Sequence, residues 1–480
     1  MSRGGANTSS GGSMSNGATT ASGGSNSAGG GCCPNVAGSS QSGSAGSAGV
    51  EAGDAGAPAG GESSGPICTE ACPASLLLSV GPTKRYLVTG AGAPFQLRGD
   101  APWTLTVQLT REDIAKYLDD RQAKHFNAIL VEPAEPKFGS TAPANAYGDQ
   151  PFVGGDFVAL NEPYWQLVDY IVDAAAERGI VVLMYPLYLG YEGGDEGWYV
   201  KAVAAGATAI QKYGASVAAR YQAADNLIWV NGGDYEPPTL EIPDALAAGI
   251  LSKDKRHLFT THWGRNSAGT DGAPSWLTLN SSYTDQANVS SLALSAYQHK
   301  PALPVFVIES RYENSYEGQP TLSAKDVRGE AWQSLLSGAC GYTFGNHGIW
   351  PFAAGWPTQL NSPGAQSMQH AFDFFEGIEW WKLLPSADGS LVTAGQGASG
   401  SVEFAAASAA ADGSLAVVYV PDGREISVSM AKFASNVTAR WFDPAAGTYA
   451  DVAGSPFAPR GVQKLDPPGT SDAVLLLQAK

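Results

Sequence analysis

The chain has few basic side chains and lacks a hydrophobic run long enough to cross a membrane. Its 480 residues include 28 Lys or Arg and 45 Asp or Glu, which gives a net charge of −17. Nucleic-acid binding depends on Lys and Arg contacts to phosphate, so this charge argues against a nucleic-acid partner. A membrane-spanning helix needs roughly 20 consecutive apolar residues, and none occurs. We therefore expect a protein that is not transmembrane and that binds a neutral or polar ligand as a monomer.

The signature motifs of several enzyme classes are also missing. There is no GxSxG nucleophile elbow, no Walker loop and no dinucleotide-binding fingerprint. No HExxH motif or comparably spaced cluster supports a metal site, so one built from His262, His347 and nearby acids has weak support. We predict that the protein uses neither a metal nor an organic cofactor.

Large apolar side chains are nearly absent from the N-terminal segment. Residues 1–66 consist mostly of Gly, Ser and Ala and contain a single basic residue, Arg3. Such a segment cannot bury enough surface to offset its ordering entropy, so residues 1–75 are predicted to form a disordered linker. Four cysteines lie in it, Cys32, Cys33, Cys68 and Cys72, and their clustering suggests disulfides in an oxidising compartment. We expect a secreted or cell-surface protein whose leader is encoded upstream of Met1.

A strand-then-helix alternation runs through residues 76–384. The eight predicted strands span residues 95–99, 127–132, 180–185, 227–231, 258–261, 277–280, 305–308 and 341–344. Eight strands with crossovers over about 290 residues match a (β/α)₈ barrel, which short strands within residues 76–98 precede as a small β cap. An open doubly wound sheet is the alternative, but it would normally carry a Gly-rich phosphate loop after its first strand.

The pattern changes after Trp381 to short strands separated by tight turns. Asp412-Gly413 and Asp422-Gly423 are typical of two-residue hairpin turns. Residues 385–480 are therefore predicted to form an antiparallel β-sandwich.

Two of the predicted barrel strands lead into a lone acid. Residues 226–234 end in Asp234 and residues 304–309 end in Glu309. A continuous apolar run is typical of a buried parallel strand, and ligands bind at the carboxyl ends of such strands. Two acids are the minimum equipment for cleaving a glycosidic bond, so we interpret them as a catalytic pair. Alternatively, Asp234 could cap the next helix and Glu309 could pair with Arg311.

Other polar and aromatic side chains follow predicted strands at the same end of the barrel. Indole faces bury the apolar C–H surface of sugar rings, while polar neighbours bind the hydroxyl groups. Taken singly, each residue could be structural, but their shared location favours a role in substrate binding. The candidates are Asp100, Trp103, Asn231, His262, Trp263, Asn280, Arg311, Tyr312, Glu313, His347 and Trp350.

Five segments in this order resemble the apiosidase-like glycoside hydrolases, over residues from about 80 to 480. They are Gly99-Asp-Ala-Pro-Trp103, Phe126-Asn-Ala-Ile129, Asn226-Leu-Ile-Trp-Val-Asn-Gly-Gly-Asp234, Glu309-Ser-Arg-Tyr-Glu-Asn314 and Gly341-Tyr-Thr-Phe-Gly-Asn-His-Gly-Ile-Trp350. Members of that family carry a (β/α)₈ catalytic domain and a small C-terminal β domain named for collagen binding. Their best characterised activity releases apiose from a branched pectin side chain.

The resemblance implies a retaining mechanism in which Asp234 is the general acid/base and Glu309 is the nucleophile. The chain differs from the family's usual residues at Ala101-Pro102 and at Tyr342-Thr-Phe344, which bears on the sugar more than on the reaction. We expect a glycoside hydrolase acting on a plant-type or other polysaccharide side chain, with a poly- or oligosaccharide as substrate. The alternatives are a non-catalytic carbohydrate- or matrix-binding protein with a degenerate barrel and an adhesin whose stalk and sandwich bind.

Overall fold

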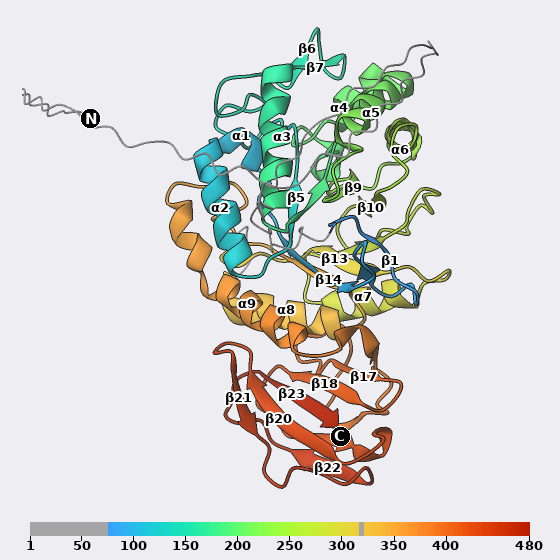
Figure 1. The fold of residues 1–480 in the computed structure, drawn as a ribbon, viewed down its shortest axis with the longest axis vertical. Coiled ribbons are helices and arrows are strands. Elements are labelled where there is room, and N and C mark those ends of the chain that lie inside the picture. The colour runs from blue at the N-terminus through green and yellow to red at the C-terminus, as the bar shows by residue number, and fades with distance from the viewer. Residues whose placement is uncertain (1–74, 316–320) are drawn as a thin grey trace, which may run out of the picture. The chain divides into compact units, whose positions relative to one another are not determined.

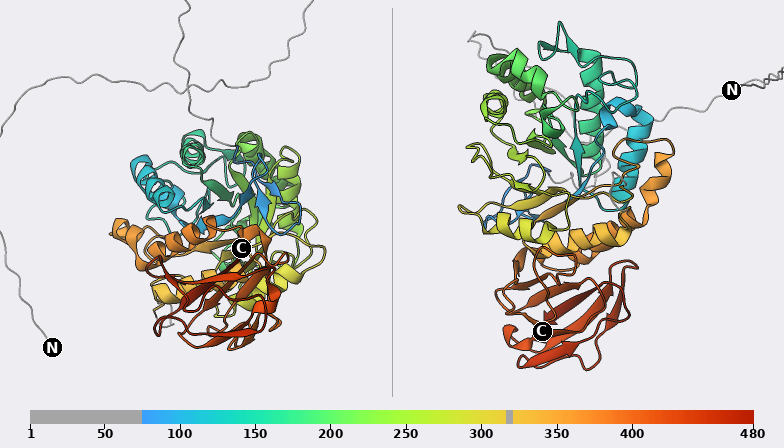
Figure 2. Two further views of the ribbon diagram at one scale, coloured as in Figure 1. Left: turned by 60° about the horizontal axis from the view of Figure 1, so that its bottom comes forward. Right: turned by 180° about the vertical axis from the view of Figure 1, so that it is seen from behind.

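The chain begins its described part with a small β cap, continues into an α/β barrel and ends in two packed antiparallel sheets (Figures 1 and 2). The computed structural model describes residues 75–315 and 321–480. The predicted linker and its four cysteines lie outside the described residues. Among these residues, no helix is long and apolar enough to span a membrane.

A nine-stranded sheet forms the barrel, in the order β10-β9-β8-β5-β4-β14-β13-β12-β11. The eight strands from β10 to β12 pair in parallel, and β11 pairs antiparallel with β12. Their bounds are β4 Leu97–Asp100, β5 Ala128–Val131, β8 Val181–Met184, β9 Leu227–Gly232, β10 Leu258–His262, β11 Ser267–Ala268, β12 Asn280–Tyr283, β13 Val305–Glu309 and β14 Gly341–Phe344.

The two ends of this sheet meet where β10 approaches β12. The Leu279 N–H donates to the Phe259 carbonyl over 3.1 Å, and the Ser281 hydroxyl donates to the Thr261 carbonyl over 2.6 Å. The sheet is therefore nearly closed, and the prediction of a barrel rather than an open doubly wound sheet is confirmed.

The sixth predicted strand was misplaced by three residues. The apolar run at residues 277–280 suggested it, but β12 starts at Asn280 and has the polar sequence Asn-Ser-Ser-Tyr. All four residues are nevertheless buried, and the side chains of Asn280 and Ser281 find polar partners inside the barrel wall. A strand of this kind shows no hydrophobic pattern.

The helices cover the outside of the barrel, as Figure 1 shows for α2, α3, α8 and α9. Thr110 caps α2 by accepting from the Asp113 N–H, and Ser323 forms a capping box with Asp326 at the start of α8. The bounds are α1 Leu105–Gln108, α2 Arg111–Ala123, α3 Glu162–Glu177, α4 Tyr199–Ala205, α5 Ala207–Tyr221, α6 Glu241–Leu251, α7 Val289–Gln298, α8 Ala324–Leu336 and α9 Pro363–Glu376. Short 3₁₀ turns are η1 Tyr191–Gly193, η2 Trp356–Asn361, η3 Trp380–Lys382 and η4 Met430–Lys432.

Side chains of the barrel strands alternate between the interior and the helix layer. In β5, Ala128 and Leu130 belong to the interior cluster, whereas Ile129 and Val131 pack in the cluster that contains the residues of α3. This two-residue period decides which side chains at a strand end can reach the mouth of the barrel.

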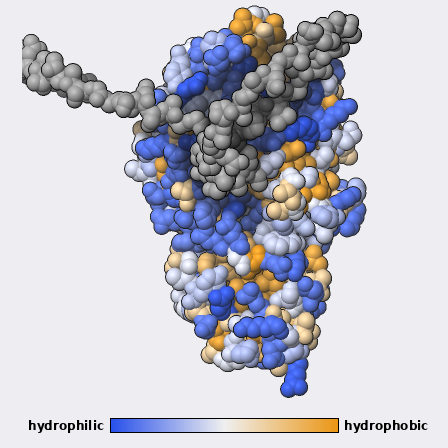
Figure 3. Space-filling view, viewed as in Figure 1, coloured by the Kyte–Doolittle hydropathy of each residue, from blue (hydrophilic) through white to orange (hydrophobic). Residues whose placement is uncertain are grey.

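Two small β elements accompany the barrel. The cap is a three-stranded sheet of β1 Ser79–Val80, β2 Leu87–Val88 and β3 Pro94–Phe95, and a hairpin is formed by β6 Phe152–Val153 and β7 Ala159–Leu160. Hydrophobic residues gather over this hairpin at the top of Figure 3, where Val153 and Val158 are exposed.

The C-terminal sheets pack around their own core and against the barrel. The six-stranded sheet is β15 Leu383–Pro385, β17 Ala407–Ala410, β18 Leu415–Val420, β23 Ala473–Ala479, β20 Val437–Asp443 and β21 Thr448–Asp451; the three-stranded sheet is β16 Val392–Ala394, β19 Ile426–Ser429 and β22 Val462–Leu465. This confirms the predicted antiparallel sandwich. One hydrophobic cluster combines Trp332 of α8 and Phe374 of α9 with Tyr419 and Phe442 of the sandwich.

Candidate active site

Three ionisable side chains from separate strands meet at the carboxyl end of the barrel. Glu309 ends β13, His262 ends β10, and Asp234 lies two residues beyond β9. One carboxylate oxygen of Asp234, one of Glu309 and one ring nitrogen of His262 lie within 4.8 Å of one another. Residues 234 and 309, far apart in the sequence, therefore share one site, as the strand-end argument predicted.

Glu309 is nearly buried and is held by aromatic neighbours. The Tyr312 hydroxyl donates to its Oε1 over 2.5 Å, and the Trp103 Nε1–H donates to the Tyr312 hydroxyl over 2.7 Å. His262 Nε2 lies 3.0 Å from Glu309 Oε2, although the geometry is not that of a hydrogen bond. Oε2 therefore accepts no hydrogen bond from the described residues and keeps its lone pairs available.

The alternative pairing of Glu309 with Arg311 is wrong. Arg311 Nε instead bonds to the buried carboxylate of Glu330 on α8, outside the barrel wall. β13 ends at Glu309, so the regular alternation of the strand does not extend to Arg311, and the Arg311 side chain points to α8 instead of to the site.

Asp234 is placed by a sharp turn of the backbone at the end of β9. Gly232, Gly233 and Asp234 all have positive φ, of 97°, 119° and 55°. A Cβ on Gly233 would lie 2.2 Å from the Tyr188 ring, so only glycine fits at this close approach. The alternative in which Asp234 caps the next helix is wrong, because α6 begins seven residues later at Glu241.

The surroundings of Asp234 raise the pKa of its carboxyl group. Burial and the negative charge of Glu309 raise the pKa of Asp234 to about 6, while His262, Tyr283 and Arg265 act in the opposite direction. Asp234 Oδ2 also accepts from the Tyr188 hydroxyl over 3.3 Å. Asp234 therefore retains a proton at mildly acidic pH.

Aromatic residues line the space around these acids. The Trp103 ring stacks on the His262 ring with centroids 5.8 Å apart, and the Tyr185 hydroxyl lies 3.3 Å from His262 Nδ1. His347 and Trp350 follow β14 in a neighbouring loop, with ring centroids 6.2 Å apart. The structure thus brings Trp103, His262 and Tyr312 to the acids.

Several predicted substrate-binding residues instead hold the scaffold. Asp100 is fully buried and faces α2, where it accepts from the Tyr117 hydroxyl and pairs with Arg121 Nη1 at 3.1 Å. Asn231 donates to the Pro243 carbonyl, and the Trp263 indole donates to the Asp271 carbonyl.

Asn280 and Glu313 also bond within the protein. Asn280 stands at the amino end of β12, remote from the strand ends where the acids meet, and accepts from the Thr270 N–H. Glu313 accepts from Asn346 Nδ2 and from the Gly364 N–H in the first turn of α9. A position near a strand end is therefore not enough to identify a residue of the site, because the direction of the side chain decides whether it faces the site.

Sequence reasoning missed Tyr188, Tyr283 and Arg265. The Arg265 Nε lies 3.3 Å from the Tyr283 hydroxyl, and a register shift in β12 pairs Tyr283 with Glu309. Tyr283 was missed because the sixth strand was predicted at residues 277–280, whereas Tyr283 is the last residue of β12. Tyr188 could have been found as the third residue after the strand predicted at residues 180–185.

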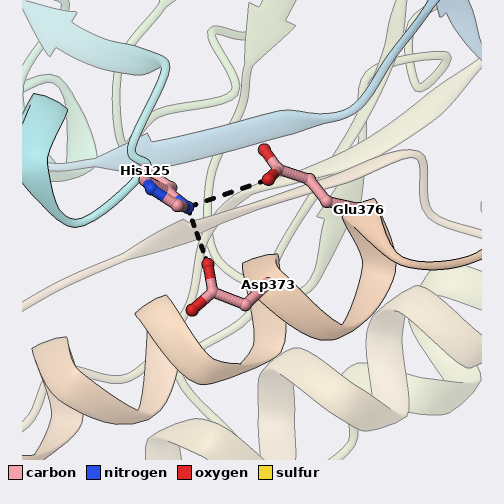
Figure 4. A group of neighbouring side chains, drawn as sticks. All are labelled: His125, Asp373 and Glu376. Atoms are coloured by element: carbon pink, nitrogen blue, oxygen red, sulfur yellow. Dashed lines mark ion pairs between the residues drawn. The ribbon is translucent and has the colours of Figure 1, made fainter.

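A second cluster of metal-ligating side chains lies at the opposite, amino end of the barrel strands (Figure 4). His125 Nδ1 is 2.6 Å from Asp373 Oδ1 and 3.8 Å from Glu376 Oε2. One imidazole and two carboxylates could hold a divalent cation, but Arg98 already pairs with Glu376. In this structure the exposed side chains of His125, Asp373, Glu376 and Arg98 contact one another directly.

Comparison with protein families decides the assignment. Residues 82–382 match the family model described as "Apiosidase-like, catalytic domain". The chain belongs to the apiosidase-like family. An apiosidase cleaves a glycosidic bond, so the barrel is the catalytic domain of a glycosidase. Residues 388–478 match a second model, "Putative collagen-binding domain of a collagenase".

Solved structures share the fold of this apiosidase-like protein. A glycoside hydrolase family 5 protein from Bacteroides vulgatus has a TM-score of 0.75 at 22% sequence identity, with 84% of this chain and 93% of that chain covered. A second glycoside hydrolase has a TM-score of 0.74 at 24% identity, with 84% and 97% covered. No curated protein matches the chain in sequence.

Proposed function

We propose that the protein is a retaining glycoside hydrolase that releases a sugar from a polysaccharide side chain, with Glu309 as nucleophile and Asp234 as general acid/base. The observation that carries this proposal is the meeting of the two carboxyl groups within 4.8 Å at the carboxyl end of the barrel. Retaining enzymes hold their carboxyl groups roughly 5–5.5 Å apart, whereas inverting enzymes need roughly 6.5–9.5 Å to admit a water molecule. The short separation favours retention.

In the first step, a Glu309 oxygen attacks the anomeric carbon while Asp234 gives its proton to the leaving glycosidic oxygen. The glycosidic C–O bond breaks as the Glu309–sugar bond forms. An acid with a pKa of about 6 holds this proton at mildly acidic pH and releases it readily.

In the second step, ionised Asp234 takes a proton from water, and the resulting hydroxide attacks the same carbon. The sugar leaves with its original anomeric configuration, Glu309 regains its charge, and Asp234 is protonated again. Tyr312 stabilises the Glu309 carboxylate when it departs, because its hydroxyl already donates to Oε1.

The same geometry favours catalysis over the non-catalytic alternative with a degenerate barrel. Both acids are present, they converge, and the pKa of Asp234 is raised to about 6, as a general acid requires. Secretion or display on the cell surface is part of the proposal, and its support is the Gly/Ser/Ala-rich segment with its clustered cysteines.

The proposal is tested by screening pectic and hemicellulosic oligosaccharides for a released sugar and recording its first-formed anomer by NMR. Retention with the wild-type protein is expected. A 2-deoxy-2-fluoro glycoside of the released sugar should leave an adduct on Glu309, detectable by mass spectrometry of the digested protein. Inversion of configuration, or an adduct on another residue, would contradict the assigned roles.

A further inference from the structure

Glu132 directly follows β5, two residues beyond Leu130 of the interior cluster. Leu130 pairs with Leu183 of β8, and both belong to the interior cluster. Two residues further along, Tyr185 keeps to this interior row and lies 3.3 Å from His262. Because side chains alternate with a period of two, Glu132 stands next to Tyr185 in the same layer.

The carboxyl group of Glu132 has no partner in the described part of the chain. The residue is only 3% exposed, and no described side chain or backbone N–H donates to it. Its Oε1 is buried without a hydrogen bond. A buried polar group left in this state costs about 1–3 kcal/mol, so its retention calls for an explanation.

The titratable groups around Glu132 offer it no positive charge. They are Glu135 on the same loop, Tyr164 of α3, Tyr185 and Tyr188 at the end of β8, and Tyr213 of α5. Glu135 is itself occupied, since it accepts from the backbone N–H groups of Lys137, Phe138 and Gly139. Burial and the charge of Glu135 raise the pKa of Glu132 well above its usual range, which favours the protonated form of the group.

We propose that Glu132 is a specificity-determining residue whose buried, unpartnered carboxyl group hydrogen-bonds a hydroxyl group of the bound sugar. The inference rests on the proposed function of the same site and adds a contact that the two catalytic acids do not supply. A carboxylic acid carries one donor and a free acceptor, as a sugar hydroxyl does, so the two groups can satisfy each other.

A first experiment needs no substrate. The Tm of E132Q and of wild type is measured from pH 4 to pH 9, with the exposed E112Q as the matched control. A group whose pKa is raised by folding destabilises the protein as the pH rises above its unfolded value. E132Q should therefore gain Tm over wild type progressively as the pH rises, while E112Q follows wild type. Parallel curves for E132Q and wild type would overturn the proposal.

A second experiment measures kcat/KM on the pectic oligosaccharide that wild type hydrolyses best. E132L removes both the donor and the acceptor, so it should lower kcat/KM by about tenfold or more without lowering Tm. E132Q keeps an amide donor and acceptor and should lose less. An E132L variant with wild-type kcat/KM would overturn the contact while the proposed function, tested by the Glu309 adduct, still stood.

Failure of the proposed function would give a different result. If wild type hydrolyses no oligosaccharide, calorimetry compares the affinity of wild type and E132L for the same pectic oligosaccharide mixture. Weaker binding by E132L would support the contact. Equal affinities, or no binding by either protein, would overturn it.

Discussion

The Tyr312 hydroxyl donates a 2.5 Å hydrogen bond to Glu309, three residues earlier in the chain. This donor receives a hydrogen bond in turn from the Trp103 indole, which stacks on His262. The position of Glu309, the proposed nucleophile, is therefore set by a series of hydrogen bonds. The series runs from Trp103, in the loop after β4, through Tyr312 to the carboxylate. The position of this carboxylate depends on groups that take no part in the bond changes.

Replacement of Tyr312 by phenylalanine should weaken catalysis without unfolding the protein. Hydrogen bonds to charged groups contribute about 1.5–3 kcal/mol, so kcat/KM is expected to fall by about 10- to 100-fold. Tyr449→Phe, at a half-exposed position in the sandwich, is the control and should keep wild-type activity. A Y312F variant with wild-type kcat/KM would show that the nucleophile needs no such support.

The pH dependence of kcat/KM should have an alkaline limb near pH 6. Asp234 must be protonated to act as an acid, and its pKa is raised to about 6 by burial and by Glu309. The nearby guanidinium of Arg265 lowers this pKa, so Arg265→Gln should move the limb to higher pH. Arg256→Gln, which removes a surface ion pair with Asp225, should leave it in place. A limb that stays unmoved in R265Q would contradict the assignment of Asp234.

Asp234→Asn should stabilise the protein at neutral pH while abolishing activity. The pKa of Asp234 is raised on folding from 3.8 to about 6, so its contribution to stability is lost as the pH rises through that interval. The loss amounts to about 3 kcal/mol once the pH exceeds 6, and D234N avoids it. Urea unfolding at pH 4 and pH 7 checks the prediction: the gain should appear at pH 7 and nearly vanish at pH 4.

Arg328→Met should strongly destabilise the protein. Arg328 of α8 bonds to both carboxylate oxygens of Asp472, at 2.7 and 2.6 Å, and both side chains are buried. Removal of one partner leaves a buried charge alone, which costs about 3–5 kcal/mol. Lys464→Met breaks the exposed pair with Glu425 and should cost under about 1 kcal/mol. Chemical unfolding of both variants gives the comparison.

The barrel was predictable from its apolar strands, but the position of β12 was not, because most of its residues are polar. Strands such as β9 and β13 are buried on both faces and read as continuous apolar runs. In β12 all four positions are buried although three of them are polar, and the side chains of Asn280 and Ser281 find partners in the wall. Polar burial depends on neighbours far away in the sequence, so no local pattern reveals it.

The candidate acids were predictable because each stands alone after an apolar strand. Their companions were harder to choose, since Asp100 ends β4 and Glu132 directly follows β5, but the two residues have opposite places in the alternation of side chains. Asp100 turns towards Arg121, whereas Glu132 stands two residues beyond Leu130 of the interior cluster. A shift of one residue in the alternation moves a side chain from the interior to the helix layer. Strand bounds predicted from sequence are in error by more than one residue, so they cannot decide which way such a side chain faces.

The hydrophobic cluster that spans α8, α9 and the sandwich has a consequence for anyone who dissects this protein. The Trp332 and Tyr419 rings lie nearly parallel, with centroids 6.3 Å apart, one from each domain. A cut at the domain boundary would expose this aromatic layer on both halves. Heat should therefore melt barrel and sandwich in a single calorimetric peak, and the barrel expressed alone should precipitate rather than serve as a portable catalyst.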